Sequence, residues 1–152
     1  MTFRIRGVAF MAVNVYLNFN GNCREAVEYY AQVFGTEVPK MMTFGEGPSD
    51  PNYPMPEEAK SLIMHTRLNI QGNLVMFSDT FPGMPFVQGN NFTLSVVDAD
   101  IESLKAIFHK LKEGGNVIME LQETFWSKLY GSVTDKFGIQ WQINHDNGEM
   151  AW

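Results

Sequence analysis

The chain has 152 residues, which suits one domain or two small modules with a shared core, and its 45% hydrophobic and 18% charged content is that of an ordinary soluble globular protein. A formal net charge of −6, with basic residues clustered only at one predicted helix end, argues against a nucleic-acid-binding surface. The single cysteine excludes an internal disulfide and suits a reducing cytoplasm, and no segment approaches the ~20 consecutive apolar residues that span a bilayer.

The first predicted elements are a strand and a helix that follow an N-terminal extension. Residues 1–12 are predicted to be this extension, because residues 13–19, "VNVYLNF", are the first with the alternation of a polar strand. The next segment, "GNCREAVEYYAQVFG", has an apolar stripe at helical spacing. Asn22 with Glu25 three residues later matches a capping box, and Gly35 suits the left-handed residue that ends a helix.

Two strands are predicted to complete the first half of the chain. They are "SLIMHTRLNIQ" and "NLVMFSDT", which follow a loop rich in Gly, Pro and Asp and meet at a turn over residues 71–73.

The second half repeats this order of elements. "NFTLSVV", residues 91–97, is a predicted strand, and "DADIESLKAIFHKLKEGG" is a predicted helix that is capped by Asp98 or Asp100 and ends at Gly114. "NVIMELQ" is a further strand, followed by an aromatic turn, "ETFWSKLYG", and a short strand near Ser132.

The last predicted strand, in "TDKFGIQWQINH", has two chemically different faces. Apolar and amide residues alternate strictly along it. The apolar face suits packing under a helix, so the amide face is expected to look into a concave cleft. The apolar residues are Ile139, Trp141 and Ile143, and the amides are Gln140, Gln142 and Asn144.

The two halves predict a tandem βαβββ repeat, and therefore an α+β fold. Gly72 of "IQGNLVMFSD" and Gly138 of "KFGIQWQINH" occupy matching turns. The first module spans about 13–80 and the second about 91–145, within a single domain of residues 13–152. One such module leaves an apolar sheet face poorly covered, so the two are expected to close around a shared core with a small-molecule cleft on the concave side of the curved sheets.

Three segments of the chain resemble a known family, the PhnB-like proteins. The segments are "YLNFNGNCREAVEYYAQVFG", "IMHTRLNIQGNLVMFSDT" and "QETFWSKLYGSVTDKFGIQWQIN". Some members carry the label 3-demethylubiquinone 3-methyltransferase-like, and the family belongs to the vicinal-oxygen-chelate superfamily of glyoxalase I, bleomycin-resistance proteins and extradiol dioxygenases. The resemblance covers about residues 13–145 and implies the glyoxalase/bleomycin resistance fold. It implies no single reaction, because isomerases, dioxygenases, transferases and drug-binding proteins share this scaffold.

The resemblance also implies where a metal ion would lie. Enzymes of the superfamily hold a divalent cation with His, Glu or Gln from the first and last strands of each module. The residues at those positions here are Val15 or Tyr16, Met76 or Phe77, Asn91 or Phe92, and Gln142. Only Gln142 has a suitable donor, and one amide oxygen is too little to hold a cation. We therefore expect no cofactor, with a divalent metal at His65 and Gln142 as the alternative.

Candidates for binding a small molecule are Tyr16, His65, Phe125, Trp126 and Gln142. His65 falls on a polar strand face, where it is either a base or ligand in a cavity or a hydrogen-bonded surface histidine. Gln142 is either a hydrogen-bonding group of a pocket or a solvated amide. Phe125 and Trp126 either clamp a flat ligand or fill a seam between modules or subunits.

Cys23 falls in the first turn of the first helix, where the helix dipole lowers the pKa of a thiol. It is therefore either a nucleophile or, as the alternative, a small buried core residue.

These observations together predict a cytoplasmic homodimer that binds a small organic molecule in its cleft without the usual metal centre, and that binds neither nucleic acid nor membrane. The first alternative is a metal-dependent lyase, isomerase or dioxygenase with a depleted or relocated site. The second is transferase chemistry on quinone-like rings, which the family label alone implies.

Overall fold

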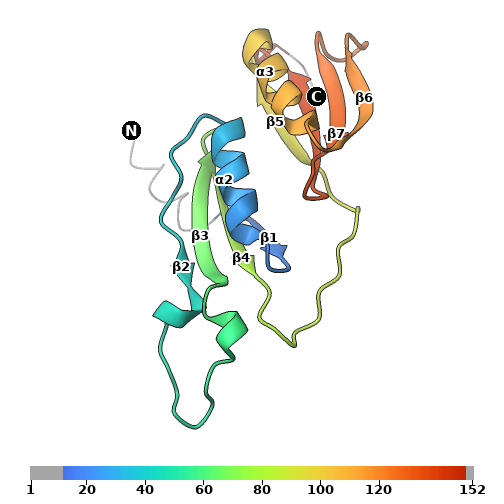
Figure 1. Cartoon of the computed structure of the whole chain (residues 1–152). Helices are drawn as coiled ribbons and strands as arrows, with labels where there is room; N and C mark the ends of the chain where they lie inside the picture. The colour runs from blue at the N-terminus through green and yellow to red at the C-terminus, as the bar shows by residue number, and fades with distance from the viewer. Residues whose placement is uncertain (1–11, 150–152) are drawn as a thin grey trace, which may run out of the picture. The chain divides into compact units, whose positions relative to one another are not determined.

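The computed structural model describes residues 12–149, in which two units repeat one topology (Figure 1). The predicted extension, residues 1–12, lies outside the described part except for Ala12. The chain divides into two compact units between Phe86 and Val87. The first contains β1 (Val15–Phe19), α2 (Cys23–Val33), β2 (Met42–Thr43), β3 (Ile63–Ile70) and β4 (Asn73–Asp79). The second contains β5 (Leu94–Asp98), α3 (Ile101–Lys112), β6 (Asn116–Gln122), β7 (Tyr130–Thr134) and β8 (Gln140–His145).

Each unit is an open, four-stranded mixed sheet with one α-helix, which confirms the predicted α+β fold of βαβββ modules. The strand order is β1-β4-β3-β2 in the first sheet and β5-β8-β7-β6 in the second. The first strand of each unit is parallel to the last, and the remaining pairs are antiparallel. The parallel pairs are possible because a helix makes each crossover connection.

The N-terminus of α2 is capped by a distant carboxylate rather than by the predicted capping box. Asn22 makes no side-chain cap bond. Instead, Asp79 Oδ1 at the end of β4 accepts the backbone N–H groups of Gly21 at 2.9 Å and Cys23 at 3.0 Å. Its Oδ2 accepts the N–H of Ile63 at 2.9 Å. The capping prediction was wrong because the acceptor comes from the far end of the unit, and Asp79 thereby ties the helix, β3 and β4 together.

The other end of α2 and the β3–β4 turn follow the sequence signals. Gly35 has φ +66°, and the pair of backbone bonds from Gly35 N to Gln32 O and from Thr36 N to Ala31 O closes the helix as expected for a Schellman motif. Gln71 (φ 52°) and Gly72 (φ 83°) form a two-residue hairpin turn with both residues left-handed, the type I′ geometry that matches strand twist.

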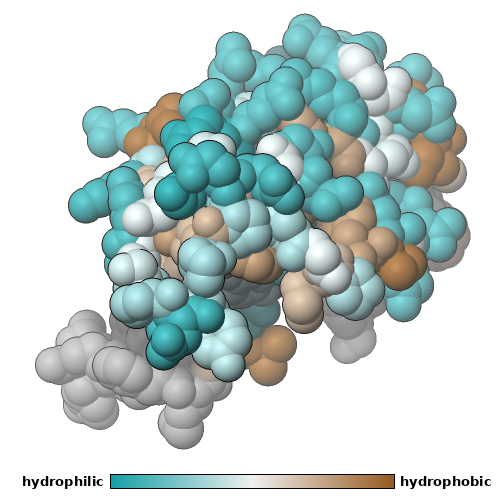
Figure 2. All heavy atoms as spheres, turned by 60° about the horizontal axis from the view of Figure 1, so that its bottom comes forward, coloured by the Kyte–Doolittle hydropathy of each residue, from teal (hydrophilic) through white to brown (hydrophobic). Residues whose placement is uncertain are grey.

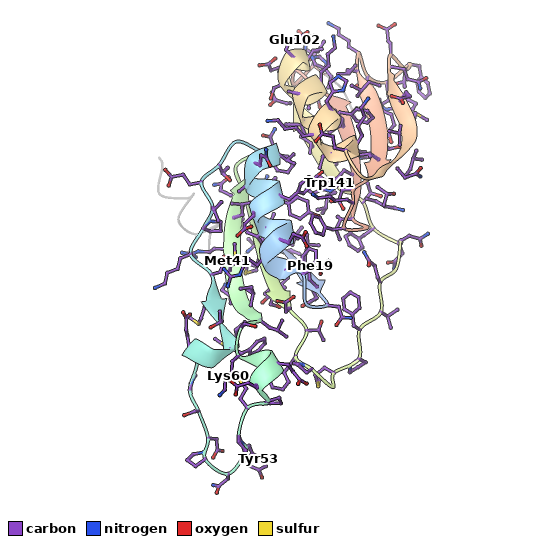
Figure 3. All side chains as sticks on the ribbon, viewed as in Figure 1. Phe19, Met41, Tyr53, Lys60, Glu102 and Trp141 are labelled. Carbon is purple, nitrogen blue, oxygen red and sulfur yellow. The ribbon has the colours of Figure 1, made fainter. Side chains whose placement is uncertain are left out.

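The core of the first unit lies between α2 and one face of its sheet, where the helix lies along the strands in Figure 1. Leu17, Phe19 and Phe77 are buried on this face. The Tyr30 ring of α2 stacks on Phe77 with 6.0 Å between ring centroids. Strand β2 was not predicted, because a two-residue edge strand is too short to show an alternation. The loop that follows it carries Tyr53 at its tip (Figure 3), 80% exposed.

Helix α3 of the second unit begins at Asp100, which decides between the two predicted caps. Asp100 Oδ1 accepts the N–H groups of Glu102 at 3.0 Å and Ser103 at 3.2 Å, whereas Asp98 Oδ1 accepts the N–H of Asp100. The predicted apolar stripe packs inward and includes Leu104, Ile107, Phe108 and Leu111.

Strand β8 has the two faces that its alternation predicts. Ile139, Trp141 and Ile143 are 6%, 2% and 0% exposed, on the side of the sheet that α3 covers, and Figure 3 labels Trp141 in this unit. The amides Gln140, Gln142 and Asn144 are only partly exposed and lie on the other side. The predicted amide face is therefore confirmed as the face opposite the helix.

The strand registers define equivalent positions in the two units. Tyr16 pairs with Met76 in the first sheet, and Ser95 pairs with Gln142 in the second. Equivalent residues are thus 79 positions apart in sequence in the first strands (Tyr16 and Ser95) and 66 positions apart in the last strands (Met76 and Gln142). Strand β5 begins at Leu94, three residues after the predicted start, so Asn91 and Phe92 lie outside it. The second-module position implied for a metal ligand is corrected accordingly to Ser95.

No helix in residues 12–149 is long and apolar enough to cross a membrane. On the face shown in Figure 2, hydrophilic residues predominate and apolar ones are scattered among them.

Candidate functional site

The first sheet has a polar face opposite α2, and two of the candidate residues meet on it. Tyr16 Oη and His65 Nδ1 lie 3.3 Å apart in a hydrogen bond between β1 and β3. Their rings are 5.9 Å apart, centroid to centroid. Beside them, Ser78 Oγ donates to Asn18 Oδ1 at 3.4 Å. The His65 imidazole therefore has a hydrogen-bonded partner two strands away, across β4.

The second sheet has a matching polar face opposite α3, on which Gln142 is held at both ends of its amide. Tyr130 Oη donates to Gln142 Oε1 at 3.0 Å, and Gln142 Nε2 donates to Ser95 Oγ at 3.1 Å. The Tyr130 ring makes an edge contact with Trp126, 5.3 Å between centroids. We call these four residues, Ser95, Gln142, Tyr130 and Trp126, the aromatic–amide line.

The turn that carries the two candidate aromatic residues is held in place by hydrogen bonds of Ser127. Ser127 Oγ donates to the carbonyl oxygens of Leu129 at 2.8 Å and His145 at 3.1 Å, which ties the turn to β8. Phe125 is 98% exposed and lies edge-on to Trp126 at 4.8 Å. The structure thus brings Phe125, Trp126 and Gln142 into one group, with Tyr130 as the link.

Tyr130 and Ser95 were missed by the sequence analysis, although a signal for both was present. Period-two alternation in "YGSVT" places Tyr130 on the same face as Ser132, the register partner of Gln142. Starting that strand at Ser132 excluded the tyrosine. Likewise, the predicted start of the first strand of the second module at residue 91 placed the equivalent position at Asn91 or Phe92 instead of Ser95.

The internal repeat shows that the aromatic–amide line has an altered counterpart in the first unit. The register equates Tyr16 with Ser95, and Met76 with Gln142. Strand β3 of the first unit corresponds to β7 of the second. When the Thr66–Phe77 pairing is continued by one residue, His65 falls opposite Ser78, and it is therefore equivalent to Tyr130, which pairs with Asn144. Both units therefore place hydrogen-bonding groups on the outer two of three adjacent strands, but the thioether of Met76 stands where the second unit has an amide.

Asn144 provides an acceptor that no described residue uses. Its Oδ1 is buried and has no hydrogen-bond partner in the described part of the chain. In the register Asn144 lies between Val97 of β5 and Tyr130 of β7, next along the face to Gln142. Because buried amide oxygens are normally satisfied, a donor from outside the described residues is expected there.

Of the four positions implied for a superfamily metal site, only Gln142 carries a side chain of the kind that ligates the metal in those enzymes. They hold the phenol of Tyr16, the thioether of Met76, the hydroxyl of Ser95 and the amide of Gln142. Zinc requires imidazole, thiolate or carboxylate donors, and manganese and magnesium prefer carboxylates. In residues 12–149, moreover, no group of three or more His, Cys, Asp or Glu side chains could hold a metal ion. These residues do not fit a divalent cation.

The Cys23 thiol is buried at the start of α2, which settles its role as a core residue. The residue is 0% exposed. Burial raises the pKa of the Cys23 thiol from its ordinary value of 9.0 to about 12; the nearby Asp79 carboxylate adds to this rise, and Arg24 opposes it. Desolvation therefore outweighs the helix dipole, and the expectation of a lowered thiol pKa was wrong.

This raised pKa predicts how stability changes with pH. The folded state keeps the Cys23 proton up to about pH 12, whereas the unfolded thiol ionises near pH 9, so the stabilising contribution is complete below pH 9 and is lost between these values. Urea denaturation from pH 8 upward should show a steeper loss of stability in the wild type than in Cys23→Ala. At pH 8 the native thiol should also react with Ellman's reagent at least about tenfold more slowly than the urea-unfolded thiol. Equal labelling rates would contradict the buried position.

Comparison with known proteins agrees with the fold and identifies the family. Residues 11–144 match the family model described as 3-demethylubiquinone-9 3-methyltransferase. Protein YjdN of Escherichia coli strain K12 is 38% identical over 144 residues, which cover 88% of this chain and 95% of YjdN.

Two solved structures are similar as well. Protein PA1353 from Pseudomonas aeruginosa is 35% identical with a TM-score of 0.76, over 89% of this chain and 98% of that one. A glyoxalase/bleomycin resistance protein/dioxygenase family enzyme from Burkholderia phytofirmans PsJN shares the fold at 17% identity, with a TM-score of 0.57 over 88% of this chain and 98% of that one. The chain therefore belongs to the 3-demethylubiquinone-9 3-methyltransferase family of PhnB-like proteins, and its fold is that of the glyoxalase/bleomycin resistance proteins.

Proposed function

We propose that this protein binds a small organic molecule with a planar, oxygen-substituted ring, and that the aromatic–amide line contributes to the site. The observation that carries the proposal is the Gln142 amide, whose oxygen and nitrogen are both bonded to protein. A solvated surface amide rotates freely between water molecules. A fixed amide instead presents one remaining N–H and one remaining lone pair in defined directions, which is the preorganisation that a binding site needs.

The groups beside Gln142 suit the same kind of ligand. Trp126 and Tyr130 supply aromatic surface, and ligand pockets favour aromatic walls with a few fixed polar groups. The unpaired Oδ1 of Asn144 calls for a donor such as a phenolic hydroxyl. The free N–H of Gln142 calls for an acceptor such as an ether or carbonyl oxygen. A ring with a hydroxyl and a neighbouring ether group meets both requirements.

The description of the family supports this ligand class. Its name refers to a demethylated ubiquinone, which is a ring that carries a hydroxyl group in place of a methoxy group. The sequence has no glycine-rich G-x-G-x-x-G motif for a nucleotide-type cofactor. We therefore propose binding of such a ring rather than methyl transfer to it.

We further propose that binding needs no divalent cation. The proposal rests on the donor set at the four equivalent positions, in which a phenol, a thioether, a hydroxyl and an amide replace the ligands of the metal-dependent enzymes. The rival enzyme with a site relocated to His65 and Gln142 has less support, because one imidazole and one amide are too few ligands for a divalent cation, and the described residues contain no group of three or more His, Cys, Asp or Glu that could add to them.

Binding of 2-methoxyphenol, measured by NMR titration in the presence of EDTA, tests the proposal. It should bind at least about threefold more tightly than 1,2-dimethoxybenzene, which lacks the hydroxyl donor for Asn144. Gln142→Leu should weaken binding of 2-methoxyphenol by about five- to tenfold, because it removes the free N–H and releases Tyr130 and Ser95. The control is Gln32→Leu, at an exposed glutamine of α2, which should change nothing. If the two ligands bind equally, or if binding requires a metal ion, the proposal is wrong.

We also propose that the protein is a cytoplasmic homodimer in which two copies pair through β6. This strand is one of the two edge strands of the second sheet, and it exposes Ile118 (56%) and Met119 (38%). Unpaired edges that carry apolar side chains are surfaces on which strands associate. Sedimentation velocity that shows only monomer at micromolar concentration would contradict the dimer.

A further inference from the structure

A recess in the second unit is lined by acidic and aromatic side chains. It has a volume of about 260 Å³ and lies between the turn 123–128 and the residues that follow β8. Three carboxylates, one ammonium group and two aromatic rings are among the groups that line it. These residues are Glu123, Asp146, Glu149, Lys128, Phe125 and Trp126.

His145 lies at the edge of this recess with an uncommitted imidazole. The residue is only 8% exposed, and it lines the recess. Its backbone is held on both sides, because His145 N donates to Leu129 O at 2.9 Å and His145 O accepts from Ser127 Oγ at 3.1 Å. Its ring, in contrast, is hydrogen-bonded to no residue of the described range 12–149. A polar side chain that is buried this far and left without a partner is available to a ligand in the recess.

The recess is separate from the polar groups of the aromatic–amide line. His145 has the same place in the β8 alternation as the buried Ile143, on the side that α3 covers, whereas Gln142 points to the other side. Trp126 is common to both, because it touches the Tyr130 ring and also lines the recess.

The charges and rings around the recess select the chemical class of its ligand. The excess of carboxylates disfavours an anion. A bare divalent ion is disfavoured too, because the described residues contain no cluster of three ligating side chains. An organic cation satisfies all of the groups: the carboxylates balance its charge, the faces of Trp126 and Phe125 attract it through cation–π contacts, and His145 hydrogen-bonds its polar end. We propose that this recess is a binding site for a small organic ammonium ion.

Choline is the probe for this proposal, and its neutral isostere 3,3-dimethyl-1-butanol is the control. The two molecules have the same shape and hydroxyl group but differ in charge. In NMR titrations of the full chain at low salt, choline should shift the amide signals of residues 123–128 and should bind about tenfold more tightly than the alcohol. If neither molecule binds, or if the two bind equally, the recess does not select a cation and the proposal fails.

Two variants and two controls locate the site. Asp146→Asn keeps the acceptor that Gly148 N uses but removes the charge, and Phe125→Ala removes a ring that is 98% exposed and so leaves the fold intact. Each should weaken choline binding about three- to tenfold. Tyr53→Ala and Asp50→Ala, both at exposed positions of the first unit, should leave choline binding unchanged. Choline binding that survives both Asp146→Asn and Phe125→Ala would overturn the assignment.

Discussion

Asp79→Ala is expected to lower the free energy of unfolding by about 3–5 kcal/mol. The carboxylate is 4% exposed and accepts three backbone N–H groups, from Gly21, Cys23 and Ile63, at 2.9–3.0 Å. Alanine leaves these donors without this acceptor, and the bonds to the N–H groups of Cys23 and Ile63 are buried. It also disconnects the start of α2 from β3 and β4. Urea denaturation followed by circular dichroism measures the loss.

Two control variants show whether the hydrogen bonds are the cause. Asp79→Asn keeps one carbonyl oxygen and the shape of the side chain, so it should cost less than alanine, about 1–3 kcal/mol. Asp50→Ala removes an exposed carboxylate that accepts only the N–H of Asn52, and it should cost less than about 1 kcal/mol. A loss for Asp79→Ala no greater than that for Asp50→Ala would show that the long-range cap does not stabilise the unit.

Asp135→Ala should destabilise the second unit by a similar amount, about 3–5 kcal/mol, and should also weaken ligand binding. Asp135 is 3% exposed. Its Oδ1 accepts the N–H groups of Phe137 at 2.8 Å and Ile139 at 3.1 Å, and its Oδ2 accepts Trp141 Nε1 at 2.9 Å. These bonds shape the turn that leads into β8 and hold the buried face of that strand. Without them, the register that presents Gln142 on the opposite face is less well defined.

A double-mutant cycle with Trp141→Phe isolates one of these bonds. Trp141→Phe keeps an aromatic ring in the core but removes the indole N–H. The coupling free energy between Asp135→Ala and Trp141→Phe should be about 1–2 kcal/mol in urea denaturation, since each substitution abolishes the same charge-assisted hydrogen bond. Strictly additive losses would mean that the Asp135–Trp141 bond contributes nothing.

Local patterns were sufficient to predict most of the fold. The apolar residues at 3.6-residue spacing in both helices, and the apolar–amide alternation of β8, depend only on which side chains are buried. They can therefore be predicted from the local sequence. The hairpin turn at Gln71 and Gly72 and the end of α2 at Gly35 were readable for the same reason, because they depend on a residue's own backbone freedom.

Features that depend on contacts between distant segments were not predictable in this way. The cap of α2 comes from Asp79, 56 residues beyond the Cys23 amide that it accepts, and no local pattern marks that pairing. The two-residue strand β2 exists only because β3 offers an edge to pair with.

The candidate site also has one residue that the local sequence predicts and others that depend on contacts between distant segments. Gln142 was found from the alternation of its own strand, whereas Ser95 and Tyr130 become evident only when the register sets them beside it. The unused oxygen of Asn144 is a property of packing that no sequence pattern records.

Native mass spectrometry of the purified protein, before and after exhaustive dialysis against EDTA, tests most directly the claim that side chains of this chain alone hold an organic ligand. The wild type, equilibrated with 2-methoxyphenol, should show a one-to-one adduct of the ligand's mass that persists after the chelator, and Gln142→Leu should lose most of that adduct. An adduct that disappears with the metal, or one that Gln142→Leu retains in full, would contradict the account.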